Sequence, residues 1–171
     1  PLDRGTANYV NAILDSFELS QDRTYLLKAE HIIQHTVHPN EDVSQRNLHD
    51  VETTWFYTVF LQSLTRYLSV KEALSELDEV FYYARDCLLN YANWMSQNEY
   101  LYLEKPEILE YPNDTWTAQD LRKAHIFAAA YFYAPDNFTV YLQKAEYFER
   151  EVAARLNNCA TKTYTRIMVL V

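Results

Sequence analysis

Glycine is almost absent from this chain, because Gly5 is the one glycine among 171 residues. Globular proteins average about 7% glycine. Without glycines the sequence cannot build a glycine-rich phosphate loop, a dinucleotide-binding fingerprint or a P-loop. Tight β-hairpins with primed turns are disfavoured as well, because they need residues at positive φ. The composition therefore excludes the common nucleotide-binding designs.

Cysteines and clustered cations are also scarce. Cys87 and Cys159 do not make a disulfide framework, and they are compatible with the cytoplasm. The net charge is −9 and no Lys/Arg cluster occurs, which argues against nucleic acid and membrane surfaces as partners. No apolar run reaches membrane-spanning length and no signal peptide is recognisable, so the compartment stays open. Because the chain starts at Pro1, we expect a processed product or a piece of a longer protein.

Helical repeats dominate what is present. Segments that begin at Tyr25, Val80 and Tyr141 carry apolar residues at the same helical offsets. The last two segments each follow a helix that opens with Thr-Trp, at Thr54 and Thr115, 61 positions apart. The sequence therefore predicts three helical hairpins, of which the second and third are in register.

The fold class predicted from these repeats is all-α. The six expected helices span residues 6–18, 23–37, 51–69, 76–97, 116–133 and 138–157. The helix from Val51 is apolar nearly all round and the even-numbered helices are one-sided, which predicts an inner and an outer layer. Ser20 and Ser75 lie where N-caps are expected. The long connections 38–50 and 98–115 contrast with short turns, and we expect them to carry function at one end.

Two parts of the chain differ in character. We expect a helical domain at residues 1–158 and a tail at 159–171. Residues 163–171 are β-branched and aromatic, which predicts a short strand. A lone strand is not stable. It would therefore pair with a strand outside this sequence or with a partner chain.

Two segments stand where inner helices are expected to begin. They read Asp50-Val-Glu-Thr-Thr-Trp-Phe56 and Glu110-Tyr-Pro-Asn-Asp-Thr-Trp-Thr-Ala-Gln-Asp120. Together with the hairpins they resemble part of an (α/α) toroid, the barrel of six-hairpin glycosidases, sugar epimerases and polysaccharide lyases. Those families place active-site loops at this position and close the ring with twice as many hairpins. The resemblance implies half of a carbohydrate-active toroid, glycosidase- or epimerase-like, with its cleft at the long-loop end.

Four carboxylates are candidate catalytic groups: Asp50, Glu52, Glu110 and Asp114. Placed at one rim, a pair of them could act as general acid and base on a glycosidic bond. The alternative is structural, because acidic residues are favoured as helix caps and in the first helical turn. Both interpretations stay open.

Four further residues are candidates for substrate binding. Trp55 and Trp116 hold equivalent positions, where they could stack on a sugar ring or pack in the core. Arg46 and His49 lie in the most polar stretch of a long loop and could bind an anionic group, supply a base or simply be solvated. The acidic long loops favour a neutral saccharide over a polyuronate.

No metal or cofactor is predicted. His31 and His35 form an i,i+4 pair, but the intervening residues lack the glutamate of a zinc-protease motif, and no further ligand is nearby. Whether the chain is an enzyme stays open. The alternative is a helical-repeat interaction module that binds a partner, contacts the remainder of a longer chain, or self-associates to close a ring.

Overall fold

The computed structural model describes residues 1–136 and 138–158, and the regular secondary structure of this part of the chain is all helical, without strands. The six long helices are α1 (Arg4–Ser20), α2 (Arg23–Thr36), α4 (Tyr57–Ala73), α5 (Glu79–Asn98), α6 (Thr115–Tyr133) and α7 (Thr139–Asn158). Shorter turns are α3 (Val51–Thr54), η1 (Val43–Arg46), η2 (Tyr102–Glu104) and η3 (Pro106–Ile108). The predicted all-α class with six helices is confirmed. The predicted strand at 163–171 lies outside the described residues.

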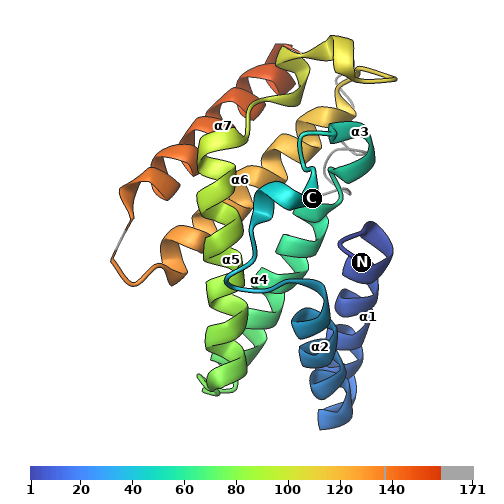
Figure 1. Cartoon of the computed structure of the whole chain (residues 1–171), viewed down its shortest axis with the longest axis vertical. Coiled ribbons are helices and arrows are strands. Elements are labelled where there is room, and N and C mark those ends of the chain that lie inside the picture. Colours follow the sequence, from blue (N-terminus) through green and yellow to red (C-terminus); the bar gives the residue numbers. More distant parts are fainter. Residues whose placement is uncertain (137, 159–171) are drawn as a thin grey trace.

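The long helices pack as three neighbouring hairpins, α1–α2, α4–α5 and α6–α7 (Figure 1). Helices α1 and α6 both contact α4, whereas α2 and α7 both contact α5. One layer therefore consists of α1, α4 and α6, and the other consists of α2, α5 and α7. Among the described residues, no helix combines the length and the apolar character needed to cross a membrane.

Apolar stripes account for this packing. Leu26, Ala29 and Ile33 are buried on α2, and Phe81 and Ala84 are buried on α5. Burial of one large apolar side chain contributes about 1.5–3 kcal/mol, so each repeated stripe attaches its helix firmly to the other layer. Helix α4 is buried on nearly every side, as its apolar sequence predicts.

The helix predicted at 51–69 is wrong in its continuity. The structure divides it into α3 and α4, with a tighter turn at Trp55 and Phe56, and α4 runs on to Ala73. At the break, the amide of Thr58 donates to the carbonyl of Trp55 at 3.2 Å, three residues back instead of four. The Thr58 hydroxyl donates to the same carbonyl at 2.8 Å. Such a local hydroxyl bond competes with the regular helical pattern.

The predicted N-caps at Ser20 and Ser75 are also wrong. Asp22 caps α2 and Asp78 caps α5, because each carboxylate accepts a backbone N–H of the first turn. Ser20 is the last residue of α1. Ser75 follows α4 in the left-handed region at φ 58°.

Left-handed backbone is provided here without glycine. In the described part of the chain, the residues at positive φ are Gln21, Asn47 and Ser75. The Gln21 amide donates to the carbonyl of Phe17 at 2.7 Å, which closes the end of α1. A side chain in this region costs about 1–2 kcal/mol relative to ordinary helical backbone. Polar residues under backbone strain therefore adopt the left-handed turn conformations that glycine usually provides.

Candidate functional site

A small pocket lies where α3 and α6 begin. Its volume is about 200 Å³, and its lining includes Glu52, Trp55, Tyr111, Asn113, Trp116 and Gln119. The two helix starts meet because a separate apolar cluster joins them, made of Val51, Tyr102, Leu109 and Trp116. The structure therefore brings together three of the residues predicted from the sequence: Glu52, Trp55 and Trp116.

The two tryptophans pack against each other and also line the pocket. The ring centroids of Trp55 and Trp116 are 6.3 Å apart, in an edge-to-face arrangement. The indole Nε1 of Trp116 donates to the carbonyl of Tyr111 at 3.2 Å, and the residue is 9% exposed. These contacts fix the orientation of the Trp116 ring against Trp55 at the edge of the pocket.

Glu52 is the predicted catalytic carboxylate that lines the pocket. Its Oε1 accepts a hydrogen bond from the backbone N–H of Glu110 at 2.5 Å. This bond ties the loop before α6 to α3. The Glu110 side chain is itself exposed. One carboxylate thus faces the pocket and a second stands in the adjoining loop.

The other two carboxylates lie at the margin of the pocket. Oδ2 of Asp50 accepts the Thr53 hydroxyl at 2.6 Å. Asp114 is exposed and is the N-cap residue of α6, and immediately before it the Asn113 side chain accepts the backbone N–H of Thr115 at 2.9 Å. Neither Asp50 nor Asp114 is part of the pocket lining.

Arg46 and His49 lie away from the pocket. The Nε of Arg46 donates to Glu41 at 2.7 Å, and a second guanidinium nitrogen donates to the carbonyl of Thr36 at 2.9 Å. The bond to Glu41 closes the long loop on itself, and the bond to Thr36 ties the loop to the end of α2. The ring of His49 packs on Trp94, with centroids 5.3 Å apart. The structure thus gives these two residues contacts outside the pocket lining.

A buried charge cluster lies close to the pocket. The Nζ of Lys123 lies 2.7 Å from Oε2 of Glu99, 3.0 Å from Oδ1 of Asp120 and 2.5 Å from the Tyr100 carbonyl oxygen. The three charged side chains are 0%, 4% and 0% exposed, in that order. Nζ also lies 3.2 Å from the centroid of the Tyr102 ring. Two carboxylates and one ammonium thus share a dry space.

Burial raises the pKa of Asp120, although the nearby Lys123 ammonium opposes this shift. The Tyr57 hydroxyl donates to Glu99, and burial followed by the Glu99 charge raises the pKa of Tyr57 well above its ordinary value. Because Gln119 precedes Asp120 in α6, the cluster and the pocket lining share one helical turn. The cluster therefore supports the wall of the pocket from within.

Sequence reasoning missed the amides and the buried charges. Asn113 and Gln119 lie inside the segment that resembles a toroid active-site loop, but the sequence alone indicates no chemical role for them. Asp120 and Lys123 look like ordinary polar residues of a helix. The available signal was their i,i+3 spacing in an inner helix, since buried charges are normally paired. Glu99 comes from the end of α5 and carries no local signal.

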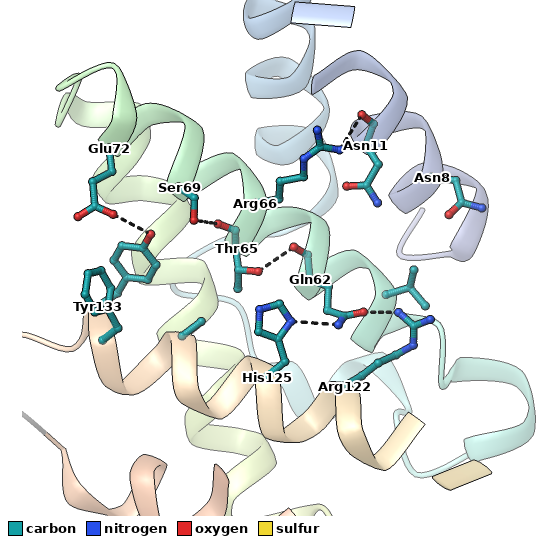
Figure 2. Close-up of a pocket in the computed structure, with 13 residues that line it drawn as sticks. Asn8, Asn11, Gln62, Thr65, Arg66, Ser69, Glu72, Arg122, His125 and Tyr133 are labelled. Carbon is teal, nitrogen blue, oxygen red and sulfur yellow. Dashed lines mark hydrogen bonds between the residues drawn. The ribbon is translucent and has the colours of Figure 1, made fainter. Parts of the chain in front are cut away.

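A second, larger hollow runs along α1, α4 and α6 (Figure 2). We call it the groove; its volume is about 790 Å³. Gln62 of α4 links the groove to α6, because its Oε1 accepts from Arg122 and its Nε2 lies 3.0 Å from Nδ1 of His125. The Nε of Arg122 donates at 3.0 Å to Gln119, which also lines the pocket. A chain of hydrogen bonds therefore connects the two hollows.

Neither a search for metal-binding clusters nor comparison with known proteins points to a function. Within residues 1–136 and 138–158, no three His, Cys, Asp or Glu side chains gather as a metal ion would require. The rings of His31 and His35 contact each other, with centroids 4.0 Å apart. The chain matches no known family model, no curated protein and no solved structure in the comparisons made. Function must be inferred from the geometry of the pocket and the groove.

Proposed function

We propose that this chain is part of a carbohydrate-active protein, glycosidase- or epimerase-like, built on half of an (α/α) toroid. Its saccharide site is the pocket at the long-loop end. The observation that carries the proposal is the meeting of Glu52 with Trp55 and Trp116 around one small hollow. The packing of three hairpins in two layers is compatible with such a half ring.

The lining suits a neutral sugar ring. Trp55 and Trp116 offer flat apolar surface, whereas the amides of Asn113 and Gln119 each carry donors and an acceptor. Apolar walls with a few placed polar groups are typical of small-molecule sites. At about 200 Å³ the pocket is smaller than the usual range of about 300–1,000 Å³. It therefore fits a single ring of a saccharide.

Glu52 is the proposed acid or base of the reaction. It is the predicted carboxylate that faces the hollow, and the Glu110 backbone holds it in place. Glycosidases use a second carboxylate, for which Glu110 and Asp114 are the candidates at the rim. Asp50 is a weaker candidate because it bonds to Thr53 outside the lining.

Indole NMR signals test the binding step directly. The protein would be titrated with neutral mono- and disaccharides while the Nε1–H signals of its three tryptophans are followed. We expect the signals of Trp55 and Trp116 to shift together. Trp94 packs on His49 away from the pocket and serves as an internal control. If no saccharide shifts the Nε1–H signal of Trp55 or Trp116, the result would favour the alternative of an interaction module.

A charge-neutral variant tests the role of Glu52. Glu52→Gln keeps an oxygen for the Glu110 N–H, so the fold should be preserved while saccharide binding persists. For any saccharide that the protein turns over, we expect the rate to fall about 10²–10⁴-fold, as for loss of a general acid or base. Glu107→Gln in the exposed turn η3 is the matched control. Full activity of Glu52→Gln would remove Glu52 from the mechanism.

A further inference from the structure

The groove contains a buried cation without a counter-ion. Arg122 is 8% exposed, and its guanidinium donates to the side-chain oxygens of Gln119 and Gln62. In the described part of the chain, no carboxylate forms an ion pair with it. Burial is the sole cause that lowers the pKa of Arg122, with no stabilising charge beside it. A guanidinium has five N–H donors, so three remain after these two bonds.

Five other arginines in the described part of the chain have carboxylate partners. Carboxylates pair with the arginines at positions 23, 46, 66, 85 and 150. Arg66 also lines the groove, but it is bonded to Asp15 at 2.6 Å and Glu18 at 2.7 Å. All five of these arginines are more exposed than Arg122. Arg4 and Arg155 also form no ion pair with a described carboxylate, but both are more exposed than Arg122. Among the described arginines, Arg122 is therefore the buried one without a carboxylate partner, and burial of an unpaired charge is costly.

The surroundings of Arg122 are polar and point into the same hollow. Asn8 and Asn11 of α1 face it across the groove, and His125 lies one helical turn further along α6 (Figure 2). Desolvation of the ring and the Arg122 charge lower the pKa of His125 below its ordinary value, which favours the neutral imidazole near pH 7 although the residue is exposed. The positive charge of this part of the groove is therefore that of Arg122.

The groove is also polarised along its length. At the end away from Arg122, the Tyr133 hydroxyl donates to Glu72 at 3.3 Å. A ligand with one negative group would thus be oriented, with its anion at Arg122 and its neutral part toward Tyr133. The volume of about 790 Å³ lies within the usual range for small-molecule sites. The net charge of −9 favours a small ligand over a polyanion.

We propose that the groove binds the oxyanion group of a small hydrophilic ligand, a carboxylate or a phosphate, with Arg122 as its counter-ion. The planar guanidinium offers a fork that matches either oxyanion. Gln62 and Gln119 hold that fork in place by occupying two of its donors. This site is distinct from the saccharide pocket, although Gln119 borders both. Arg122 and His125 report on the groove, whereas Trp55 and Trp116 report on the pocket.

The test uses the whole chain and four probes at constant ionic strength: inorganic phosphate, glucuronate, glucose 6-phosphate and glucose. Imidazole NMR signals of His125 and the Tm are followed. We expect at least one of the three anions to shift His125 and raise the Tm, because a ligand of the native state stabilises it. Glucose should leave His125 unchanged. Comparison of phosphate, glucuronate and the sugar phosphate shows which oxyanion is preferred.

Arg122→Gln then isolates the charge. Its amide keeps a donor for the neighbouring glutamines, and we expect the affinity for the anions to fall about tenfold or more, as for loss of a charged hydrogen bond. The ligand-free Tm should not fall, since a costly unpaired charge is removed. Arg150→Gln, an exposed site on α7, is the control and should bind as the wild type does.

Two results would overturn the proposal. One is the absence of any His125 shift with all three anions in the wild-type protein, which needs no variant to fold. The other is unchanged anion affinity in Arg122→Gln. Neither result bears on Trp55 and Trp116, so failure here is distinguishable from failure of the saccharide pocket.

Discussion

Lys71 and Lys123 are both buried, yet they have different neighbours. Lys71, near the end of α4, is 1% exposed and contacts Glu30, Glu76 and Asp78 at 2.6–3.2 Å. Those carboxylates are 13%, 30% and 49% exposed, in that order. Around Lys123, in α6, the carboxylates are almost completely enclosed. Lys71 thus has three carboxylate partners that reach water, whereas Lys123 has two that do not.

A tyrosine marks each lysine, which makes the comparison close. Tyr67 donates to Glu30 at 3.1 Å, and Tyr57 donates to Glu99. Burial opposes ionisation of Asp78, but hydrogen bonds from Lys71 and the first turn of α5 still hold its pKa below its ordinary value. Burial raises the pKa of Asp120. The difference teaches that access to water, more than the number of neighbouring charges, decides whether the pKa of a carboxyl group is lowered or raised.

The largest expected effect is from Lys123→Met, which leaves Glu99 and Asp120 buried without a cation. Breaking a buried ion pair in this way costs about 3–5 kcal/mol. Urea denaturation would measure the loss in free energy of unfolding. Lys71→Met is the matched control, and we expect a cost of about 1–3 kcal/mol because its partners can regain water. If the two variants lost the same free energy of unfolding, the proposed difference between the Lys71 and Lys123 clusters would be wrong.

A smaller effect is expected from Asp120→Asn, read as a function of pH. With a raised pKa, native Asp120 binds more protons than the unfolded chain above pH 3.8, so wild-type stability falls as pH rises through that window. The slope is at most about 1.4 kcal/mol per pH unit. Asp120→Asn should remove this fall and raise the stability near neutrality, since the asparagine oxygen still accepts from the Tyr102 N–H.

The corresponding variant beside Lys71 is Asp78→Asn, at a carboxylate that reaches water. Its lowered native pKa means that wild-type stability is present above pH 3.8 and is lost as pH falls through the native pKa. Asp78→Asn should therefore lower the free energy of unfolding at neutral pH. It should also make the decline of stability at acidic pH less steep. Denaturation curves between pH 2 and 8 would show opposite slopes for the two aspartates. Slopes of the same sign would contradict the pKa assignment.

The smallest effect concerns the turn that carries Glu76 to Lys71. Ser75 sits there at φ 58°, and the Glu76 amide donates to the Lys71 carbonyl at 2.9 Å. Ser75→Gly relieves backbone strain, but it adds entropy to the unfolded chain. We expect a net gain of about 0.5 kcal/mol, seen as a higher Tm. Ser69→Gly, inside α4, is the contrast and should destabilise.

Helix positions were predictable from sequence, whereas the charged interior was not. The apolar stripes that begin at Tyr25, Val80 and Tyr141 are long enough to define α2, α5 and α7. The break at Trp55 was hidden because no glycine or proline marks it. Hydroxyl-to-carbonyl bonds such as that of Thr58 depend on geometry that a pattern of apolar residues does not contain.

The candidate site was predictable only in part. Glu52, Trp55 and Trp116 shared the property of standing at helix starts, and the structure brings them together. The polar neighbours of Arg46 in the sequence predict a binding role, but in the structure Glu41 and the Thr36 carbonyl already bind it. The sequence does not reveal the importance of Arg122, because that importance comes from the lack of a carboxylate beside its buried guanidinium. Such an absence becomes visible only when every surrounding element is in place.

The hydrogen-bond chain through the groove also has a direction. Arg122 can only donate, so Gln62 must turn its oxygen toward Arg122 and its amide hydrogens toward His125. Nδ1 of His125 is then an acceptor, which places the ring proton on Nε2. One fixed cation thereby selects the tautomer of an imidazole two side chains away. A ¹⁵N spectrum of that ring would reveal the orientation of the whole chain of bonds.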